Sequence, residues 1–373
     1  MKILHICSNF AGSKVHVELY KRLAHQGEEQ VVYCPIRDEK LLDKNCFEAH
    51  GTQIIYDYVI KPYHRYLYHI KRADMFRSLQ KKLDLNSVSF CHAATLFTDG
   101  GQAYEIWKKY HIPYVVAVRN MDVNGFLDIR PETWCSGKKI LENACRIFFI
   151  SKGLMEKFCN HRIVKPILQK IKDKMMLVPN GIDDYYLDHI YHGSQIANKV
   201  LYVGDFSHNK NVVRLAQAIL ELKKEDGFDD IKLTLVGGGH NETNQLQQMV
   251  DSNPDVFDYL GPVYDKERLC EVFRAHSIFA MPSIYETFGL VYIEALSQGL
   301  PVLYTKGQGV DGLLPPNAGI GVNPLSVEEI KNALRTLLVQ RSEFSNRNIN
   351  FEQYRWSNIA TTYKDIYKEI TIK

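Results

Sequence analysis

Two carboxylates and a helix start stand close together in residues 282–302, "PSIYETFGLVYIEALSQGLPV". Glu286 precedes the expected helix, and Glu294 lies within it, with seven residues between them. Leu290 and Ala295 share a helix face with Glu294, so this face is expected to pack on a sheet. A buried ionised carboxylate without a partner is costly. Either the helix turns Glu294 toward solvent, or a polar group meets it.

Three turns marked by glycine could hold an anion at the start of a helix. Gly237 lies in "LVGGGHN", Gly12 and Ser13 in "NFAGSKVHVELY", and Gly289 in "ETFGLV". Backbone N–H groups at helix N-termini bind anions, and three such termini at one cleft would suit a diphosphate. Each turn alone is weak evidence, because a tight connection between strand and helix also needs glycine.

Short apolar runs alternate with amphipathic stretches, which predicts parallel strands joined by helices. The expected strands are "KILHIC", "EQVVYC", "VSFCHA", "PYVVAV", "RIFFIS" and "KMMLVP" in the first half, and "KVLYVG", "KLTLVGG", "VFDYLG", "SIFAMPS" and "LPVLYT" in the second. Each half is therefore expected to form a doubly wound sheet. We place the first domain at 1–182, an aperiodic linker at 183–198 and the second domain at 199–351. Ligands are expected at the carboxyl ends of the strands, in a cleft between the domains.

The composition is that of a soluble globular chain, with 373 residues, 45% hydrophobic and 24% charged. No apolar stretch approaches the roughly 20 residues of a membrane span, and no signal peptide is evident. The eight cysteines form no C-x-x-C pair, so we expect reduced thiols and no metal site. Residues 1–186 carry 28 Lys and Arg against 20 Asp and Glu, whereas the remainder carries 18 against 23. This asymmetry favours an anionic partner for the first half, unless the basic face is merely solvated.

The pattern Pro-Ser-x-x-Glu-x-Phe-Gly-Leu-x-x-x-Glu-Ala-x-x-x-Gly-x-Pro-Val resembles the donor-site signature of the retaining nucleotide-sugar glycosyltransferases of family 4. "VPNGID", "YVGDFSHNKN" and the N-domain stretch "FTDGGQAYEIWKKYHIPYVVAVRNMD" are similar to other parts of that family, the last to its polysaccharide-assembly members. The resemblance implies the GT-B fold, with two Rossmann-like α/β domains facing a cleft. It also implies that a C-terminal helix, 352–373, completes the N-terminal acceptor domain.

The same resemblance assigns roles to individual residues. Glu294 would accept hydrogen bonds from the ribose, and Glu286 would meet hydroxyls of the donor sugar. For Glu286, the competing reading is a loop residue favoured by the helix dipole. The implied catalytic residues are Glu286, Lys210 and Arg119. The implied donor-binding residues are Glu294, Phe288, Gly289, Leu290, Gly237, Gly204 and Asp205. The implied acceptor-binding residues are Gly12, Ser13, His92 and Asp122.

Two departures from the family pattern bear on these roles. Asp205 stands where members usually have arginine, although Lys210 follows as expected. An acid beside a diphosphate is unfavourable unless it turns away or pairs with a base, and His208 or Arg119 are the candidates for the missing positive charge. Arg119 and Asp122 match the Arg-x-x-Asp of the polysaccharide-type members, and the alternative is a buried ion pair between them. His92 resembles an acceptor-facing position, with a structural histidine as the alternative.

The sequence therefore predicts a retaining hexosyltransferase that uses a UDP- or GDP-sugar as substrate, with no cofactor and no metal. No nucleophile is evident, and the resemblance implies front-face attack. The acceptor would be lipid-linked or an oligosaccharide, in cell-surface polysaccharide or glycoconjugate assembly, and no nucleic acid is implied. The alternatives are a GT-B epimerase or hydrolase and a non-catalytic sugar-nucleotide binding module. We expect a cytoplasmic protein, either free or peripheral on the inner face of the plasma membrane.

Residues 61–82 are the segment that could meet a membrane. Seven basic residues stand there against one acid, Asp74, interleaved with aromatic residues. One reading is a helix packed through Leu67, Ile70, Met75 and Leu79 with a solvated basic side. The other is that this face rests on anionic lipid.

Overall fold

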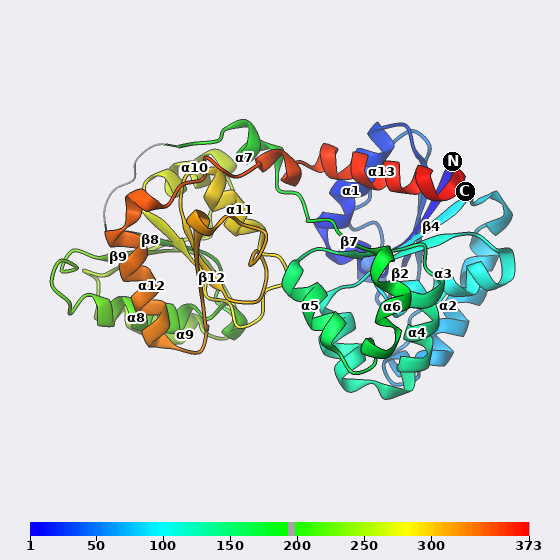
Figure 1. Cartoon of the computed structure of the whole chain (residues 1–373), viewed down its shortest axis with the longest axis horizontal. Helices are drawn as coiled ribbons and strands as arrows, with labels where there is room; N and C mark the ends of the chain where they lie inside the picture. The colour runs from blue at the N-terminus through cyan, green and yellow to red at the C-terminus, as the bar shows by residue number, and fades with distance from the viewer. Residues whose placement is uncertain (193–197, 373) are drawn as a thin grey trace. The chain divides into compact units, whose positions relative to one another are not determined.

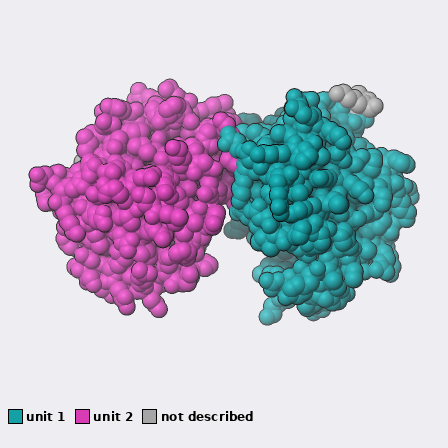
Figure 2. All heavy atoms as spheres, turned by 60° about the horizontal axis from the view of Figure 1, so that its bottom comes forward, with its two compact units in different colours: residues 1–150, 154–181, 356–373 teal, residues 151–153, 182–355 magenta. Residues whose placement is uncertain are grey.

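A computed structural model describes residues 1–192 and 198–372 of the chain. The chain folds into two compact units, coloured separately in Figure 2. Unit 1 comprises residues 1–150, 154–181 and 356–373, and unit 2 comprises 151–153 and 182–355. Part of the linker predicted over 183–198 is folded: it contains helix α7, Asp184–Asp188, which belongs to unit 2. Residues 193–197 of the predicted linker lie outside the described residues.

Unit 1 is built on a parallel sheet of seven strands in the order β3-β2-β1-β4-β5-β6-β7. The strands are β1 Lys2–Ile6, β2 Glu29–Pro35, β3 Thr52–Asp57, β4 Phe90–Ala93, β5 Tyr114–Ala117, β6 Arg146–Phe149 and β7 Met175–Leu177. The longer helices are α1 Lys14–His25, α2 Tyr68–Lys82, α3 Thr98–Tyr110, α4 Trp134–Asn143, α5 Lys152–Asn160, α6 Leu168–Ile171 and α13 Trp356–Ile372.

Helix α13 closes one face of the unit 1 sheet, although it comes from the far end of the chain. It lies beside α1 (Figure 1), and its Ile359, Tyr363 and Tyr367 share one core cluster with Ile3 of β1 and Val115 of β5. Burial of these large side chains supplies most of the driving force for docking, at about 25 cal/mol per Å² of apolar surface. The terminal helix predicted over 352–373 therefore exists in unit 1, beginning at residue 356.

Unit 2 is built on a parallel sheet of six strands in the order β10-β9-β8-β11-β12-β13. The strands are β8 Lys199–Asp205, β9 Lys232–Gly238, β10 Phe257–Gly261, β11 Ile278–Ala280, β12 Val302–Thr305 and β13 Gly319–Val322. Its helices, besides α7, are α8 Val212–Leu222, α9 Thr243–Ser252, α10 Lys266–Arg274, α11 Leu290–Ser297 and α12 Val327–Val339. The two doubly wound sheets predicted from the sequence are thus confirmed.

Two strands, β3 and β13, were not predicted from the sequence, and each lies at an edge of its sheet. β3, "TQIIYD", has only partly buried apolar residues and lies at the edge of its sheet, beside β2 alone. β13, "GIGV", has four residues, two of them glycine, and offers no alternation to detect. Edge strands form because a neighbouring strand offers hydrogen-bonding partners, which is not a property of their own sequence.

Candidate functional site

The polar residues of unit 2 gather at the carboxyl ends of β8 and β11. The strand order changes direction between these two neighbours, because β9 lies beyond β8 on one side and β12 beyond β11 on the other. Doubly wound sheets bind ligands at such a switch point. The loop after β8 carries Asp205, Asn209 and Lys210, and the loop after β11 carries Glu286.

Lys210 and Glu286 form an ion pair across this switch point. Lys210 Nζ lies 2.8 Å from Glu286 Oε2, and both side chains are mostly buried. The other carboxylate oxygen of Glu286 accepts from the Thr287 amide at 3.0 Å, and Ser283 Oγ donates to Oε2 at 3.3 Å. The structure thus brings together the two residues that the sequence proposed as the cation and the sugar-binding carboxylate. The reading of Glu286 as a solvated loop residue does not fit this burial.

Two side chains that the sequence analysis missed hold the Glu286 loop in place. From one side, Asn209 accepts from the Tyr285 amide at 3.0 Å and donates to the Tyr285 carbonyl at 2.9 Å. From the other side, Gln308 accepts from the Glu286 amide at 2.8 Å and donates to the Ile284 carbonyl at 3.0 Å. The loop that presents Glu286 is therefore fixed by both neighbouring loops. No spacing rule reveals such contacts, because they join distant parts of the chain.

The start of α11 has the geometry of an uncapped helix N-terminus. Gly289 precedes the helix with φ of 79°, and no side chain caps it. A Cβ at Gly289 would lie 2.4 Å from the Tyr292 ring, so glycine is required here. The Tyr292 amide donates to the Gly289 carbonyl at 3.1 Å, whereas the amides of Leu290 and Val291 precede the first intrahelical hydrogen bond. Phe288 is buried, with its ring 6.2 Å from the Tyr354 ring, so it packs in the core.

Glu294 lies at the boundary between the buried and the exposed side of α11. Tyr292, Ile293 and Leu296 are buried, whereas Glu294 and Leu290 remain partly exposed. Of the two outcomes left open by the sequence, the helix turns Glu294 partly toward solvent, while Ala295 of the same face is buried with Tyr292 and Ile293.

The surroundings of Glu294 disfavour its charged form. No hydrogen-bond donor or ion-pair partner of its carboxylate occurs among the described residues. Desolvation, and then the nearby negative charge of Asp183, raise the pKa of Glu294 to about 7, against the lesser opposing effect of Lys266. Lys266 itself is paired with Asp183. A polar ligand that donates hydrogen bonds to the carboxylate would stabilise the charged form of Glu294.

Asp205 ends β8, and its carboxylate turns back onto its own loop. It accepts from the Ser207 amide at 3.0 Å. Burial alone would raise the pKa of Asp205, but the hydrogen bonds from Ser207 outweigh it and hold the pKa below its usual value. His208 does not pair with Asp205, because its Nδ1 lies 2.8 Å from Glu242 Oε1. Asp205 thus turns back onto its own loop, and the supply of positive charge to a diphosphate by His208 stays a prediction.

Gly204 and Gly237 lie side by side where β8 pairs with β9. A Cβ at Gly237 would lie 1.8 Å from the carbonyl oxygen of Gly204, and its φ is 132°. Only glycine allows the two strands to end this close together. The close approach of the two strands therefore explains why residue 237 is glycine, and no bound ligand is needed to explain it.

In unit 1, Asp122 organises the loops at the carboxyl ends of β4 and β5. Its carboxylate accepts from the amides of Arg119 at 2.8 Å, Leu96 at 3.0 Å and Phe97 at 3.2 Å. Burial raises the pKa of Asp122 to about 6, although these hydrogen bonds oppose it. The alternative reading of a buried ion pair with Arg119 is wrong, since it is the backbone of Arg119 that meets Asp122, and the acceptor-binding role of Asp122 stays a prediction.

The other predicted acceptor-binding residues are Gly12 and Ser13, which follow β1, and His92, which lies in β4. Gly12 ends a short 3-10 helix, Phe10–Gly12, and Ser13 precedes α1 without a side-chain cap. His92 is buried instead, with Nδ1 2.7 Å from the Tyr367 hydroxyl and its ring stacked on Tyr363. This geometry matches the structural alternative for His92, since the ring contacts α13 and not a surface.

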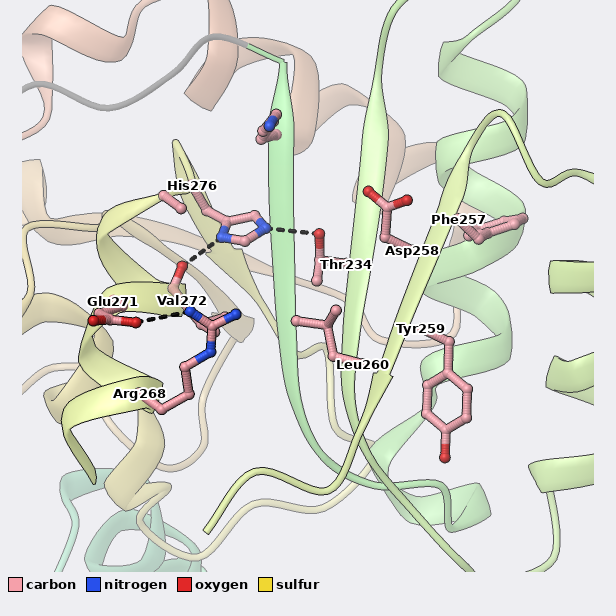
Figure 3. Close-up of a pocket in the computed structure, with 11 residues that line it drawn as sticks. Thr234, Phe257, Asp258, Tyr259, Leu260, Arg268, Glu271, Val272 and His276 are labelled. Atoms are coloured by element: carbon pink, nitrogen blue, oxygen red, sulfur yellow. Dashed lines mark hydrogen bonds and ion pairs between the residues drawn. The ribbon is translucent and has the colours of Figure 1, made fainter. Parts of the chain in front are cut away.

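A groove of about 440 Å³ in unit 2 lies apart from the switch point (Figure 3). Thr234 of β9 lies 2.7 Å from Nε2 of His276, whose Nδ1 faces the Val272 carbonyl. Arg268 and Glu271 of α10 pair with each other at 2.7 Å. These polar groups satisfy one another, and none of the motif residues lines the groove.

Two family models match the chain. The one described as "Glycosyl transferases group 1" matches residues 197–340, and the one described as "Glycosyltransferase Family 4" matches residues 12–185. An uncharacterized glycosyltransferase of Methanocaldococcus jannaschii is 23% identical over 323 residues, which is 79% of each chain.

Solved structures of the same fold cover nearly the whole chain. The apo lipopolysaccharide outer core galactosyltransferase WaaB is 16% identical, with a TM-score of 0.71 over 98% of this chain and 100% of that one. Anabaena HepE in complex with UDP-glucose is 14% identical, with a TM-score of 0.67 over 99% of this chain and 100% of that one. These likenesses identify the fold as GT-B.

Proposed function

We propose that the chain is a glycosyltransferase of the GT-B fold that transfers a hexose from a nucleotide diphosphate sugar to a lipid-linked or oligosaccharide acceptor with retention of configuration. The two glycosyltransferase models that match residues 12–185 and 197–340, together with the fold, support this proposal. The observation that carries this proposal is the Lys210–Glu286 ion pair across the unit 2 switch point. The structural relative in complex with UDP-glucose supports a nucleotide-sugar donor, and the lipopolysaccharide galactosyltransferase supports a role in polysaccharide assembly.

Lys210 would stabilise the negative charge that grows on the departing diphosphate. Preorganised cations and N–H dipoles at such a position lower the barrier, because they need no reorganisation when the charge develops. Lys210 Nζ is already fixed by Glu286 at 2.8 Å. The amides of Leu290 and Val291 at the start of α11 would add a second source of positive potential.

Glu286 would bind hydroxyls of the transferred sugar. In the unliganded pair its charge is balanced by Lys210. When the diphosphate takes up part of the charge of Lys210, the carboxylate of Glu286 becomes free to accept hydrogen bonds from the sugar. Donor binding therefore exchanges one ion pair for two ligand contacts, and little buried charge is left uncompensated.

Glu294 would accept hydrogen bonds from the ribose hydroxyls. Its carboxylate has no donor among the described residues, and its raised pKa shows that the ionised form lacks support. Hydrogen bonds from two hydroxyls would favour the ionised form and return the pKa toward its ordinary value.

Retention is proposed through front-face attack, in which the departing phosphate oxygen takes the proton of the acceptor hydroxyl. Glu286 is the acidic side chain of the donor motif nearest the proposed sugar, and its contacts to Lys210 and Thr287 suit binding better than nucleophilic attack. NMR of the product decides this point, since retention keeps the anomeric configuration of the donor and inversion reverses it.

The function is tested by incubating the full chain with a panel of UDP- and GDP-sugars. Binding is measured first, by the rise in melting temperature, because a ligand at 100 times its Kd stabilises the fold by about 2.7 kcal/mol. Turnover is then measured with and without lipid-linked and oligosaccharide acceptors. Acceptor-dependent release of nucleoside diphosphate is expected. Turnover of donor without acceptor would point to the epimerase or hydrolase alternative, and binding without turnover would point to a binding module.

Membrane contact is proposed for a surface at the start of α2, here called the basic-aromatic surface and made of Lys61, Tyr63, Arg65, Tyr66, Leu67 and Ile70. Tyr66 is 74% exposed, Tyr63 49%, and Leu67 and Ile70 45% each. The expectation that Leu67 and Ile70 pack in the core is therefore wrong, whereas Met75 and Leu79 are buried as predicted. Exposed aromatic and aliphatic side chains beside basic ones fit the interface of an anionic bilayer. No helix in the described part of the chain is long and apolar enough to cross a membrane.

The structure also sharpens the test of this surface. Arg72 pairs with Glu105 at 2.8 Å and Arg77 with Asp74 at 2.5 Å, so reversing these charges would disturb the fold. Lys61 and Arg65 form no ion pair among the described residues, and Arg65 is exposed. Changing both to Glu should abolish flotation with anionic liposomes at low salt, whereas changing Lys138 and Lys139 of α4 should not. Failure of the wild-type protein to bind such liposomes would contradict membrane contact.

A further inference from the structure

Residues 134–174 of unit 1 hold a concentration of positive charge that the proposed function does not use. The segment has 10 Lys and Arg against 3 Asp and Glu. Arg146, Lys157 and Lys170 pair with acids at 2.8, 3.5 and 3.1 Å. Cations without such partners repel one another, and an outside anion would stabilise them. Six form no ion pair with any described residue and are here called the cationic track: Lys138, Lys139, Arg162, Lys165, Lys172 and Lys174.

The cationic track follows α4, because the chain after α5 contacts both ends of this helix and α6 lies beside it (Figure 1). At the start of α4, the Arg162 guanidinium lies 4.7 Å from the centre of the Trp134 ring. At its end, Glu142 Oε1 lies 3.1 Å from Lys170 Nζ, and the Glu142 carbonyl accepts from Lys174 Nζ at 2.6 Å. A helix of 10 residues is about 15 Å long. The cations are therefore spread along a line and do not surround one point.

The start of α4 lies on the side of the sheet where the acceptor is proposed to bind. α4 joins β5 to its parallel neighbour β6, so it begins near the carboxyl ends of the strands and runs toward the other side. Ligands bind at the carboxyl ends in sheets of this kind. The Trp134 indole N–H donates to the Leu127 carbonyl at 3.0 Å, which joins the start of α4 to the segment that carries Asp122. The cationic track thus leads away from this side along unit 1.

The cationic track lacks the apolar side chains of a surface that enters a bilayer. Residues 134–174, all of them described, include no exposed large hydrophobic side chain. The basic-aromatic surface differs in this respect, since Tyr66 there is 74% exposed. Binding to a membrane interface needs apolar groups beside the basic ones. A soluble polyanion therefore fits the cationic track better than a lipid surface does.

The cationic track also lacks a platform on which nucleic-acid bases could stack. Proteins that hold single strands combine positive charge with free aromatic faces. Phe148, Phe149 and Phe158 are buried, and one face of the partly exposed Trp134 ring is covered by the Arg162 guanidinium. The surface offers charge without stacking, which fits a polyanion that has no bases.

We propose that the cationic track binds an anionic polysaccharide, a chain whose sugars carry carboxylate or phosphate groups. The inference rests on the proposed function, because it makes this chain the extension of the sugar acceptor. Acidic groups repeat along such a chain, so it can meet several lysines in succession on a linear surface. A single acidic sugar would meet only one or two of them.

The probe is fluorescently labelled polygalacturonate, titrated with the full chain and followed by fluorescence anisotropy. The salt concentration is about 0.15 M, where a Debye length of about 8 Å screens distant charges. The matched control ligand is the methyl ester of the same polymer, which keeps the sugars and removes the charge. Polygalacturonate should bind at least about tenfold more tightly than its methyl ester, and added salt should weaken it. Monomeric galacturonate should not compete.

Lys138→Glu combined with Lys139→Glu should weaken polygalacturonate binding by about tenfold or more, since two cations become anions. Lys61→Glu combined with Arg65→Glu makes the same change of charge on the basic-aromatic surface and should leave this binding unchanged. Melting temperatures equal to that of wild type show that both variants are folded. Lys165→Gln combined with Lys172→Gln, at two exposed positions, gives a second test and should weaken binding by about three- to tenfold.

The proposal is overturned if the methyl ester binds as tightly as polygalacturonate, or if the two glutamate variants weaken binding equally. It is also overturned if duplex DNA binds more tightly than polygalacturonate, or if flotation with anionic liposomes depends on Lys138 and Lys139. None of these measurements needs turnover. Absence of turnover with every donor and acceptor would therefore count against the proposed function and not against the cationic track.

Discussion

In unit 2 the loops after β8 and β11 meet through the Lys210–Glu286 ion pair, whereas in unit 1 the loop after β1 meets the first turn of α3 through a hydrogen bond from the Ser8 amide to Asp99. The two sheets share the order of their first six strands, so these are equivalent points of one topology. Unit 2 balances opposite charges there. At its switch point unit 1 directs Asp99 and Asp122 to backbone amides, and Arg119 forms no ion pair with any described residue.

The difference in charge at the two switch points suits them to different ligands, although the strand order is the same. A balanced ion pair can open toward a donor that carries both a diphosphate and sugar hydroxyls, because each partner then finds a new contact. An unpaired cation can only attract negative charge. The fold supplies the position, and the loop residues determine the chemistry.

The largest effect is expected for Lys210→Ala. Removing the cation should lower kcat by about 10²–10³-fold, the usual consequence of deleting one group that stabilises developing charge. KM for the donor should rise much less. Lys210→Arg keeps the charge and should retain more activity. If kcat of Lys210→Ala equals that of wild type, the switch point of unit 2 is not where the diphosphate leaves.

Asp122→Asn tests whether the acids of unit 1 serve the fold. The amide cannot accept three charge-assisted hydrogen bonds, so the free energy of unfolding should fall by about 2–3 kcal/mol in urea titration. Asp128→Asn is the control, because Asp128 is exposed and lies 3.5 Å from Lys157, and it should change stability by less than about 1 kcal/mol. Equal effects of both substitutions would contradict a structural role for Asp122.

Gln308→Ala tests whether the Glu286 loop needs its support from the β12 side. Loss of the hydrogen bonds to Glu286 and Ile284 should lower kcat by about tenfold, equal to about 1.4 kcal/mol, with nucleoside diphosphate affinity unchanged. Gln247→Ala on α9 removes a surface hydrogen bond to Asp251 and should leave kcat unaffected. A parallel loss of nucleotide affinity in Gln308→Ala would show that the loop is generally disordered by the change.

The smallest effect concerns Glu294 and pH. The pKa of Glu294 is raised from 4.5 to about 7 in the folded state, so the native protein retains a proton that the unfolded chain has lost. Its contribution to stability is full below about pH 4.5 and is lost as pH rises through about 7. Glu294→Gln should therefore gain stability over wild type across this range, by about 1–2 kcal/mol, since the partly exposed side chain keeps some solvation. A constant difference in urea midpoint between pH 5 and pH 8 would contradict the raised pKa.

Much of the architecture followed from periodicity and from the turns between apolar runs. The central strands were predicted because both faces are buried, which leaves continuous apolar runs such as "VVYC" in β2 and "LTLV" in β9. The edge strands β3 and β13 were missed because their pairing depends on a neighbour. Lys210 and Glu286 were identified from the motif, and the structure brings them together.

The errors arose where tertiary contacts decide the outcome. The rotation of α11 places Tyr292 inside and Glu294 at the boundary, which the local pattern of apolar residues did not reveal. The alternative for Asp122, an ion pair with the Arg119 guanidinium, did not allow for the backbone amides of two loops that bind its carboxylate. Gln308 belongs to no sequence motif, because its hydrogen bond to the Glu286 amide depends on the packing of one loop against another.

The most direct test of the account is calorimetric titration of nucleoside diphosphate into Glu294→Ala and Glu286→Ala, with wild type as reference. The account predicts that Glu294→Ala weakens binding by about 1–3 kcal/mol, as expected for lost charge-assisted hydrogen bonds to the ribose. Glu286→Ala should leave this affinity unchanged while lowering turnover, because its proposed contacts are to the transferred sugar. Equal effects of the two substitutions on nucleoside diphosphate affinity would contradict the assignment of nucleotide and sugar to separate carboxylates.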